Sequence, residues 1–424
     1  MTLKTRIRQV KWIFCTQDFQ NQFWTVIAIG AFSLFPTLLV FLVTRQVGLM
    51  HAGTLVFAFA LSELPVTLTA FAIRPFQSVD VIQEIHFNAY FGLRTICALC
   101  ASIGYAIYLL IADFDTKQLV VIILIYFMAL TNIYTDVFMG DLQQKGKMHV
   151  AGKMQASCYI AALLASLTVL IVTSSLIATL VVACLVIFVG YILWIWIYRK
   201  HFGAIRVKID FHAIKRLMIR AVPLVIAGFI MAFLVNAQKF YLEAYFSAEY
   251  VAVYGFLLIP VGLFNIICTG FFSGSISTKT AEVWAFGDVK RFKRRVNLQL
   301  LTAVGLFIPF LLCVYFFGIP LLSWILATDL SPFRVQLMLL SFGGMTRAPL
   351  YVINPMLIVF LKQRVILVCI LVVAVTIGPL MWWLVSQYGL SGAAYSTIVL
   401  YAPFSVVCYV IYRIALKKHE KESV

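Results

Sequence analysis

Four ionisable side chains lie inside long apolar segments of the sequence: Glu63, Asp136, Lys239 and Arg347. A charged group at the centre of a bilayer costs about 2.5–3.5 kcal/mol even on the lenient insertion scale, so such groups face a wet cavity or pair with one another. Lys239 and Arg347 together suit an anionic cargo, because arginine grips phosphate through a planar fork and lysine acts as a point charge. Internal pairing, for example of Lys239 with Glu243, is the alternative, and the sequence leaves both interpretations open.

Other patterns that carry chemistry are weak in this chain. Cys97 and Cys100 have redox or zinc spacing, but they lie in the middle of an apolar segment without a second pair or a nearby histidine, so core packing is the better interpretation. The six histidines are scattered, and no glycine-rich loop of the phosphate-binding type is found. We therefore expect no catalytic residue, no metal site and no cofactor.

The composition indicates which elements hold these residues. Apolar residues make up 63% of the 424 and charged residues 12%, about half the share of roughly 25% in soluble domains. The mean hydropathy is +1.00. The net charge of +17 would suit nucleic acid, but the basic residues are spread between apolar segments rather than gathered in a soluble domain. The sequence therefore predicts an integral membrane protein that binds no nucleic acid.

A bilayer core needs about 20 apolar residues per helix, and twelve segments of the chain meet that length. We expect transmembrane helices at 22–44, 51–73, 87–111, 118–139, 153–174, 175–198, 221–242, 249–273, 297–318, 335–361, 365–386 and 389–415.

The distribution of lysine and arginine supports this count. With a cytoplasmic N-terminus, 28 of the 33 basic residues fall in inner segments and four in outer ones, while Arg347 lies inside a span. A missed helix would invert every later loop and destroy this alternation, which follows the rule that inner loops are basic. Both termini are therefore predicted to be cytoplasmic.

The basic loop between spans six and seven divides the chain into two halves of six spans each. The predicted organisation is an N-terminal tail (1–21), a first six-helix bundle (22–198), a basic linker (199–220), a second six-helix bundle (221–415) and a C-terminal tail (416–424). Because both halves begin on the cytoplasmic side, they form a parallel repeat of the kind found in transporters. The fold class predicted is all-α, with twelve transmembrane helices in two bundles.

Several motifs occur in order along this frame. They are Arg74-Pro-Phe-Gln-Ser-Val-Asp80, followed by Tyr90–Arg94; Asp141–Lys153; Asn236-Ala-Gln-Lys239; and Gly392-Ala-Ala. The whole chain thereby resembles the Wzx-type polysaccharide flippases of the multidrug/oligosaccharidyl-lipid/polysaccharide exporter superfamily, whose fold is MATE-like. It departs from them at Gln238 and Phe240, where the family often has proline and tyrosine.

The resemblance implies a function and a set of partners. Such flippases move an oligosaccharide on undecaprenyl diphosphate to the outer leaflet of the bacterial plasma membrane, for capsule, exopolysaccharide or O-antigen assembly. They work by alternating access around a cationic cavity. It further implies contact with membrane lipids, coupling to a proton or a sodium ion, and association with a polymerase or other assembly proteins.

The same resemblance and the buried charges together give the expected site. We expect Lys239, Arg347, Asn236, Glu63 and Asp136 to line the cargo cavity.

A second group of residues is expected at the cytoplasmic end of the first bundle. We expect Arg74, Gln77, Asp80 and Arg94 to form a cytoplasmic gate, in which Arg74 and Asp80 pair.

Two other functions remain as alternatives. An ion-coupled antiporter of drugs or small molecules from the same superfamily shares the fold, and the match at 74–80 argues against it. A membrane polymerase or ligase would be expected to carry a large outer loop with charged catalytic residues. The outer loops predicted here are short and hold few charges.

The predicted topology has a direct test. Reporter fusions at Ala204 and Gly287 are expected to read as cytoplasmic, and a fusion at Asp113 as external, because of the partition of basic residues. A reversal at any of the three positions would contradict the two-bundle repeat.

Overall fold

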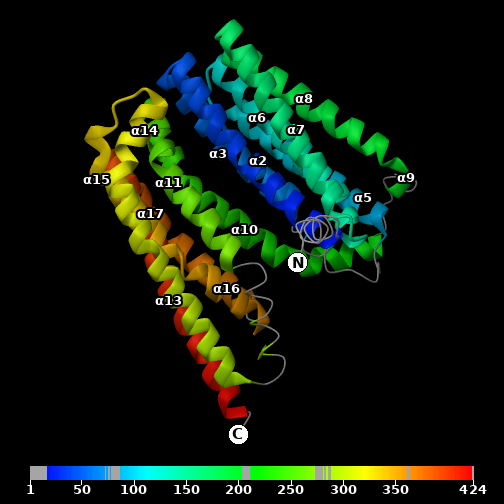
Figure 1. Cartoon of the computed structure of the whole chain (residues 1–424), viewed down its shortest axis with the longest axis vertical. Helices are drawn as coiled ribbons and strands as arrows, with labels where there is room; N and C mark the ends of the chain where they lie inside the picture. Colours follow the sequence, from blue (N-terminus) through cyan, green and yellow to red (C-terminus); the bar gives the residue numbers. More distant parts are fainter. Residues whose placement is uncertain are drawn as a thin grey trace, which may run out of the picture. The chain divides into compact units, whose positions relative to one another are not determined.

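A computed structural model describes residues 17–71, 73–74, 77, 86–202, 211–272, 280, 283–284, 288–360 and 363–422. In this part of the chain the regular elements are all helices (Figure 1). That outcome follows from the composition, because a lipid-exposed backbone must satisfy its own hydrogen bonds and the helix does so within one segment.

Ten helices of the described chain are long and apolar enough to cross a membrane, and the protein is a multi-pass membrane protein. The first eight correspond one to one with the first eight predicted spans. The ninth is longer than predicted, because α13 (Val289–Cys313), a π-helical turn at Val314–Gly318 and α14 (Ile319–Leu326) follow one another. The tenth, within α17 (Gln363–Glu422), joins the two last predicted spans.

The chain divides into two compact units, Met1–Val225 and Ile226–Val424, and the boundary falls inside α10. The first unit contains α2 (Gln17–Gln46), α3 (Leu49–Ala70), α5 (Phe87–Ile111), α6 (Thr116–Gln144), α7 (Met148–Thr173), α8 (Leu176–Ile197) and the short α9 (Arg199–Phe202). The second contains most of α10 (Phe211–Tyr245), then α11 (Ala248–Phe272), α13, α14, the 3₁₀ turn Ser331–Phe333, α15 (Arg334–Arg347), α16 (Leu350–Val359) and α17.

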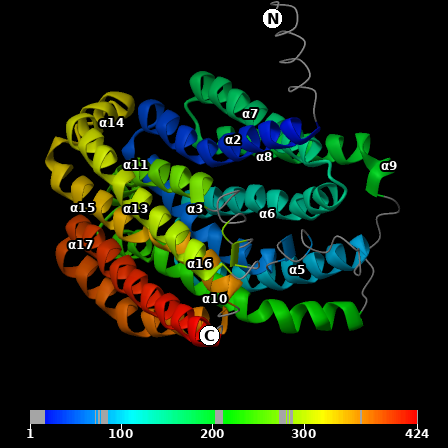
Figure 2. The same ribbon diagram turned by 60° about the horizontal axis from the view of Figure 1, so that its bottom comes forward.

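Small residues allow close helix packing in the first unit. Helix α2 lies along α7, and α7 along α8 (Figure 2). A Cβ atom at Gly152 of α7 would lie 2.6 Å from the backbone of Trp24 on α2, and one at Gly190 of α8 would lie 2.8 Å from Cys158 Sγ on α7. Without a hydrophobic driving force between helices in lipid, such close backbone approach is a main source of their association.

In the second unit, α15 packs against α17 and α11 through two adjacent glycines. A Cβ at Gly343 would lie 2.9 Å from Thr397 on α17, and one at Gly344 would lie 2.8 Å from Val261 on α11. These contacts fix α15 between two neighbours. They also fix the last turn of α15, where Arg347 lies.

The predicted span 335–361 is broken, which corrects the expectation of one continuous helix. Helix α15 ends at Arg347, and α16 begins at Leu350. Pro349 lies in the turn between them, where proline removes a backbone donor, while Ala348 before it keeps helical dihedral angles. Beside the break, the carbonyl oxygen of Thr346 accepts a hydrogen bond from Ser405 Oγ of α17.

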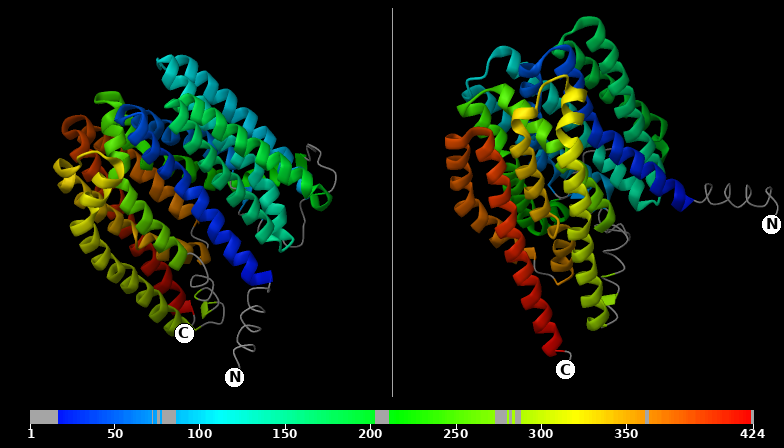
Figure 3. Two further views of the ribbon diagram at one scale, coloured as in Figure 1. Left: turned by 45° about the horizontal axis from the view of Figure 1, so that its top comes forward. Right: turned by 60° about the vertical axis from the view of Figure 1, so that its left-hand side comes forward.

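Helix α17 is bent at Gly389, whose φ of +54° and ψ of −125° are not helical. The bend divides α17 near the boundary predicted between spans eleven and twelve, and the two parts lie side by side (Figure 3). Three residues later, a Cβ at Gly392 would overlap the carbonyl oxygen of Leu384, so only glycine fits there without a backbone shift.

We expect Gly392→Ala to destabilise the second unit, because overpacking of this kind typically costs about 1–3 kcal/mol. Gly305→Ala on α13 is the matched control, since a Cβ there meets no atom within 4 Å. Thermal unfolding of the purified protein in detergent should show a lower midpoint for the first variant, and an unchanged or slightly higher one for the second. Equal midpoints would contradict the close approach at Gly392.

Candidate functional site

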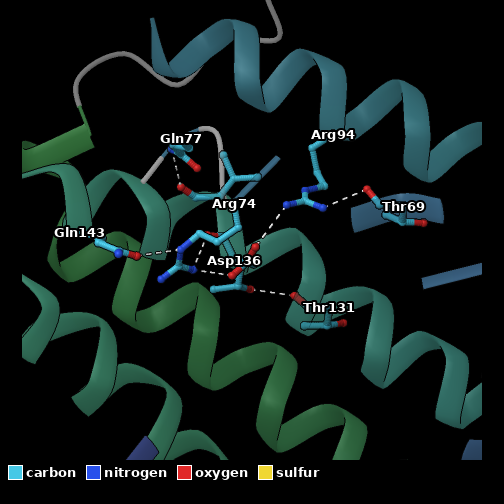
Figure 4. A network of polar contacts seen from close by, with 9 residues as sticks. Thr69, Arg74, Gln77, Arg94, Thr131, Asp136 and Gln143 are labelled. Carbon is cyan, nitrogen blue, oxygen red and sulfur yellow. Dashed lines mark hydrogen bonds and ion pairs between the residues drawn. The ribbon is translucent and has the colours of Figure 1, made fainter. Parts of the chain in front are cut away.

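A cluster of charged and polar residues lies in the first unit, centred on Asp136 of α6 (Figure 4). Arg74 Nη1 pairs with Asp136 Oδ1. Arg94 Nη2 of α5 lies 3.2 Å from Asp136 Oδ2. One carboxylate therefore joins two arginines, and the three side chains carry a net charge of +1.

Each arginine has further acceptors. Arg94 is fully buried and donates from Nη1 to the carbonyl oxygen of Thr69 at the end of α3, 2.9 Å away. Arg74 is partly exposed and donates from Nε to Gln143 Oε1 at 3.0 Å. The cluster thereby ties α3, α5 and α6 together.

Gln77 belongs to the same region. It is fully buried, and its Nε2 donates to the carbonyl oxygen of Val137 at 3.1 Å. The amide lies so close to Gly140 that a Cβ there would overlap Gln77 Oε1. Gln77 is thus held on α6 by both a hydrogen bond and a close contact.

The structure brings together three of the four predicted gate residues, Arg74, Gln77 and Arg94, and it adds Asp136 to them. Asp80, the predicted partner of Arg74, lies outside the described residues. Asp136, which was expected in the cargo cavity, lies in this cluster. Glu63, also expected there, is an exposed residue of α3. Their roles in gating and binding stay predictions.

A pocket of about 160 Å³ lies within the second unit. It receives residues from α10, α11, α15 and α17. The lining residues are Val235, Gln238, Lys239, Tyr254, Leu258, Val261, Gly262, Asn265, Gly344, Arg347, Thr397, Leu400 and Tyr401.

Lys239 and Arg347 therefore line one pocket, although 108 positions separate them in the sequence. Lys239 Nζ donates to Asn236 Oδ1, one turn earlier on α10, at 2.9 Å. Asn236, predicted in the cavity, is buried. It accepts the hydrogen bond from Lys239 and is not among the residues that line this pocket. Arg347 reaches the pocket from the broken end of α15, which the contacts of Gly343 and Gly344 hold in place.

The electrostatics of this pocket favour an anion. Its described lining holds two cations and no carboxylate. Gln238 is 2% exposed, and its Oε1 has no hydrogen-bond partner among the described residues. A buried acceptor without a partner costs about 1–3 kcal/mol, so this oxygen is suited to a ligand that brings a hydrogen-bond donor, such as a hydroxyl group, beside its anionic group.

Sequence reasoning missed three contributors to this pocket. Gln238 was noted beside Lys239 and as a departure from the family pattern, but it was not placed in the cavity. Tyr254 and Tyr401 were not singled out, since aromatic residues are common throughout the chain and no spacing relates these two to the cations. Tyr351, near Arg347 but outside the lining, follows it by only four residues, so its nearness in the sequence was a usable signal.

No family model matches the chain, and no curated protein matches it. Solved structures do. An inward-facing multidrug resistance MATE family transporter of the MOP superfamily matches with a TM-score of 0.65 and 14% identity, over 92% of this chain and 96% of that one. The fold is that of the MATE transporters.

Two further structures agree on this fold. A mutant of the Vibrio cholerae MATE transporter VcmN has a TM-score of 0.63 and 12% identity, over 95% of this chain and 97% of that one. A MOP superfamily transporter from Pyrococcus furiosus has a TM-score of 0.58 and 13% identity, over 95% of each chain. At these identities the MATE likeness concerns the fold alone, so the function of this chain is argued from its own residues.

We expect Asp136→Asn to destabilise the first unit by roughly 3 kcal/mol, because it leaves the buried Arg94 without its counter-charge. Lys117→Gln is the control, since this exposed cation at the start of α6 forms no part of the cluster. Thermal unfolding in detergent measures both. A midpoint for Asp136→Asn no lower than that of Lys117→Gln would show that the cluster contributes little to stability.

Proposed function

We propose that the protein is a flippase for undecaprenyl-diphosphate-linked oligosaccharides. In this proposal it moves the repeat unit from the inner to the outer leaflet of a bacterial plasma membrane by alternating access, and so supplies capsule, exopolysaccharide or O-antigen assembly. The MATE fold supports a transport function. The cargo is inferred from the pocket in the second unit and from the sequence motifs.

The observation that carries the proposal is the charge of that pocket. Lys239 and Arg347 line it together, and no acidic residue of the described chain lines it with them. A lipid-linked oligosaccharide presents a diphosphate, which is the anion that such a pair can meet. The carrier lipid brings the diphosphate with any glycan, so one fixed cationic site serves different sugars.

The size of the pocket points to the same part of the cargo. Drug-sized ligands occupy pockets of about 300–1,000 Å³. The volume here is about 160 Å³, which suits a phosphate-sized group better than an oligosaccharide. The proposal therefore places the diphosphate in this pocket and the glycan outside it.

An ion-coupled antiporter of drugs or small molecules is the second candidate, favoured by the multidrug resistance transporter among the structural matches. The fold is equally compatible with that function. A pocket that binds lipophilic cations would be expected to offer negative charge, and this one offers positive charge. The Pyrococcus furiosus match is itself described as having a binding pocket of reverse polarity, suggesting a different function.

The proposal includes partners. A proton or a sodium ion would supply the driving force, and a polymerase or other polysaccharide-assembly proteins would take up the exported unit. Membrane lipids surround the protein, because many large apolar side chains of both units are exposed.

The test is transport by the purified protein in liposomes that contain a fluorescent lipid-linked oligosaccharide. We expect outward movement by the wild type, and a loss of roughly ten-fold or more in Arg347→Gln and in Lys239→Gln, because a charge-assisted phosphate contact is worth about 1.5–3 kcal/mol. Lys117→Gln is the control, since this exposed cation at the start of α6 lies outside the pocket.

Two results would count against the flippase. Wild-type rates in both pocket variants would remove these cations from the site. Export of a lipophilic cation such as ethidium by the same liposomes, with no movement of the glycolipid, would favour the antiporter.

A further inference from the structure

The structure holds arginines of its two units in two different ways. In the first unit, Arg74 and Arg94 share the carboxylate of Asp136, so their charge is partly cancelled and their donors are used (Figure 4). In the second unit, Arg347 has aromatic neighbours instead. The difference bears on what each arginine is able to bind.

We propose that Tyr401 and Tyr351 are positioning residues, which hold the Arg347 guanidinium by cation–π contact so that its N–H fork grips two oxygens of one phosphate. The site would thereby select a multi-oxygen anion, such as a diphosphate, over a monatomic anion. This inference rests on the proposed function. It goes further by naming the kind of anion that the site selects and the two tyrosines that orient the Arg347 guanidinium.

The contacts come from two different helices. The Arg347 guanidinium carbon lies over the Tyr401 ring of α17, 5.1 Å from the centroid, and over the Tyr351 ring of α16, at 5.5 Å. Both distances are within the range of about 6 Å for cation–π attraction. Tyr401 is only 6% exposed and lines the pocket, so its ring has little freedom to leave the guanidinium.

Aromatic contact leaves the hydrogen-bond donors of the arginine available. A ring attracts the cation through its face, whereas a carboxylate would take two N–H groups and cancel the charge. Over the described part of the chain, Arg347 forms no ion pair, and no hydrogen bond from its guanidinium is found. The five donors of this planar group are thus available to an anion in the pocket.

Neighbouring groups complete the site for an oxygen-rich anion. Lys239 lines the same pocket and adds a second positive charge, steadied by Asn236. The amide of Gln238, almost fully buried with Oε1 unpartnered among the described residues, offers both donors and an acceptor next to them. The separate positions of these groups match the several oxygens of a phosphate and its ester or hydroxyl neighbours better than they match a single spherical ion.

The test measures binding of inorganic diphosphate, and separately of chloride, to the full-length protein purified in detergent. We expect Tyr401→Leu to weaken diphosphate binding by roughly ten-fold, since a desolvated cation–π contact is worth about that factor. Tyr401→Phe, which keeps the ring, should bind diphosphate within about two-fold of the wild type. Arg347→Lys should lose ten-fold or more, because it keeps the charge but not the fork.

Selectivity separates positioning from a merely structural role. Tyr401→Leu is expected to lose its preference for diphosphate over chloride, whereas a general loss of structure would weaken both equally. Tyr395→Leu, on the exposed side of α17, is the matched control and should bind as the wild type does. If Tyr401→Leu does not fold, Tyr351→Leu tests the second ring in the same way.

Diphosphate binding by Tyr401→Leu at wild-type affinity would overturn the inference, and so would an equal loss in Tyr401→Phe and Tyr401→Leu. The outcome is independent of transport. A protein whose diphosphate binding depends on the Tyr401 ring, but which does not move the lipid-linked oligosaccharide, would retain the inference and refute the proposed function. A protein that moves the lipid-linked oligosaccharide, but whose diphosphate binding does not depend on this ring, would refute the inference alone.

Discussion

A charge inside a bilayer must be compensated, and this constraint governs both units of the structure. Water is absent from the hydrocarbon region, so a cation there needs a counter-charge, a polar cavity or an aromatic face. The first unit meets the requirement with Asp136 of α6, which pairs with Arg94 of α5 and with Arg74 beyond the end of α3. The second meets it with rings and a pocket around Arg347. The same physical cost therefore gives a structural cluster in one unit and a candidate binding site in the other.

The backbone obeys a related constraint. A helix broken at membrane depth exposes carbonyl groups that need partners, and such breaks are tolerated where protein or a cavity surrounds them. The end of α15 fits this condition, because Ser405 of α17 donates to the Thr346 carbonyl oxygen and a pocket lies beside Arg347. Discontinuous helices mark the binding sites of many transporters for this reason. The break thus supports the same location for the site as the charges do.

The fold was largely predictable from the sequence, and the site only in part. Apolar length and the basic loops are local signals, so the spans followed from counting, and the resemblance correctly implied a MATE-like fold. The break after Arg347 was missed because a hydropathy window averages over Pro349. The pairing of Asp136 with Arg74 and Arg94 was also missed, since these contacts join residues 62 and 42 positions apart and no sequence period relates them. Charged residues at membrane depth indicated where function is to be sought, but tertiary packing decided which of them meet.

Magnitudes explain how Arg347 is accommodated without a carboxylate partner. Inserting an arginine at a helix centre costs about 2.5–3.5 kcal/mol. Each cation–π contact returns about 0.5–2 kcal/mol, depending on desolvation. Arg347 is also the last residue of α15, where the helix dipole favours a cation by about 0.3–1 kcal/mol. These contributions together are comparable with the cost, so an anion is not required to keep the arginine in place. In the proposed flippase, the positive charge is thus present before the diphosphate arrives, so the site can bind this anion and also release it on the other side.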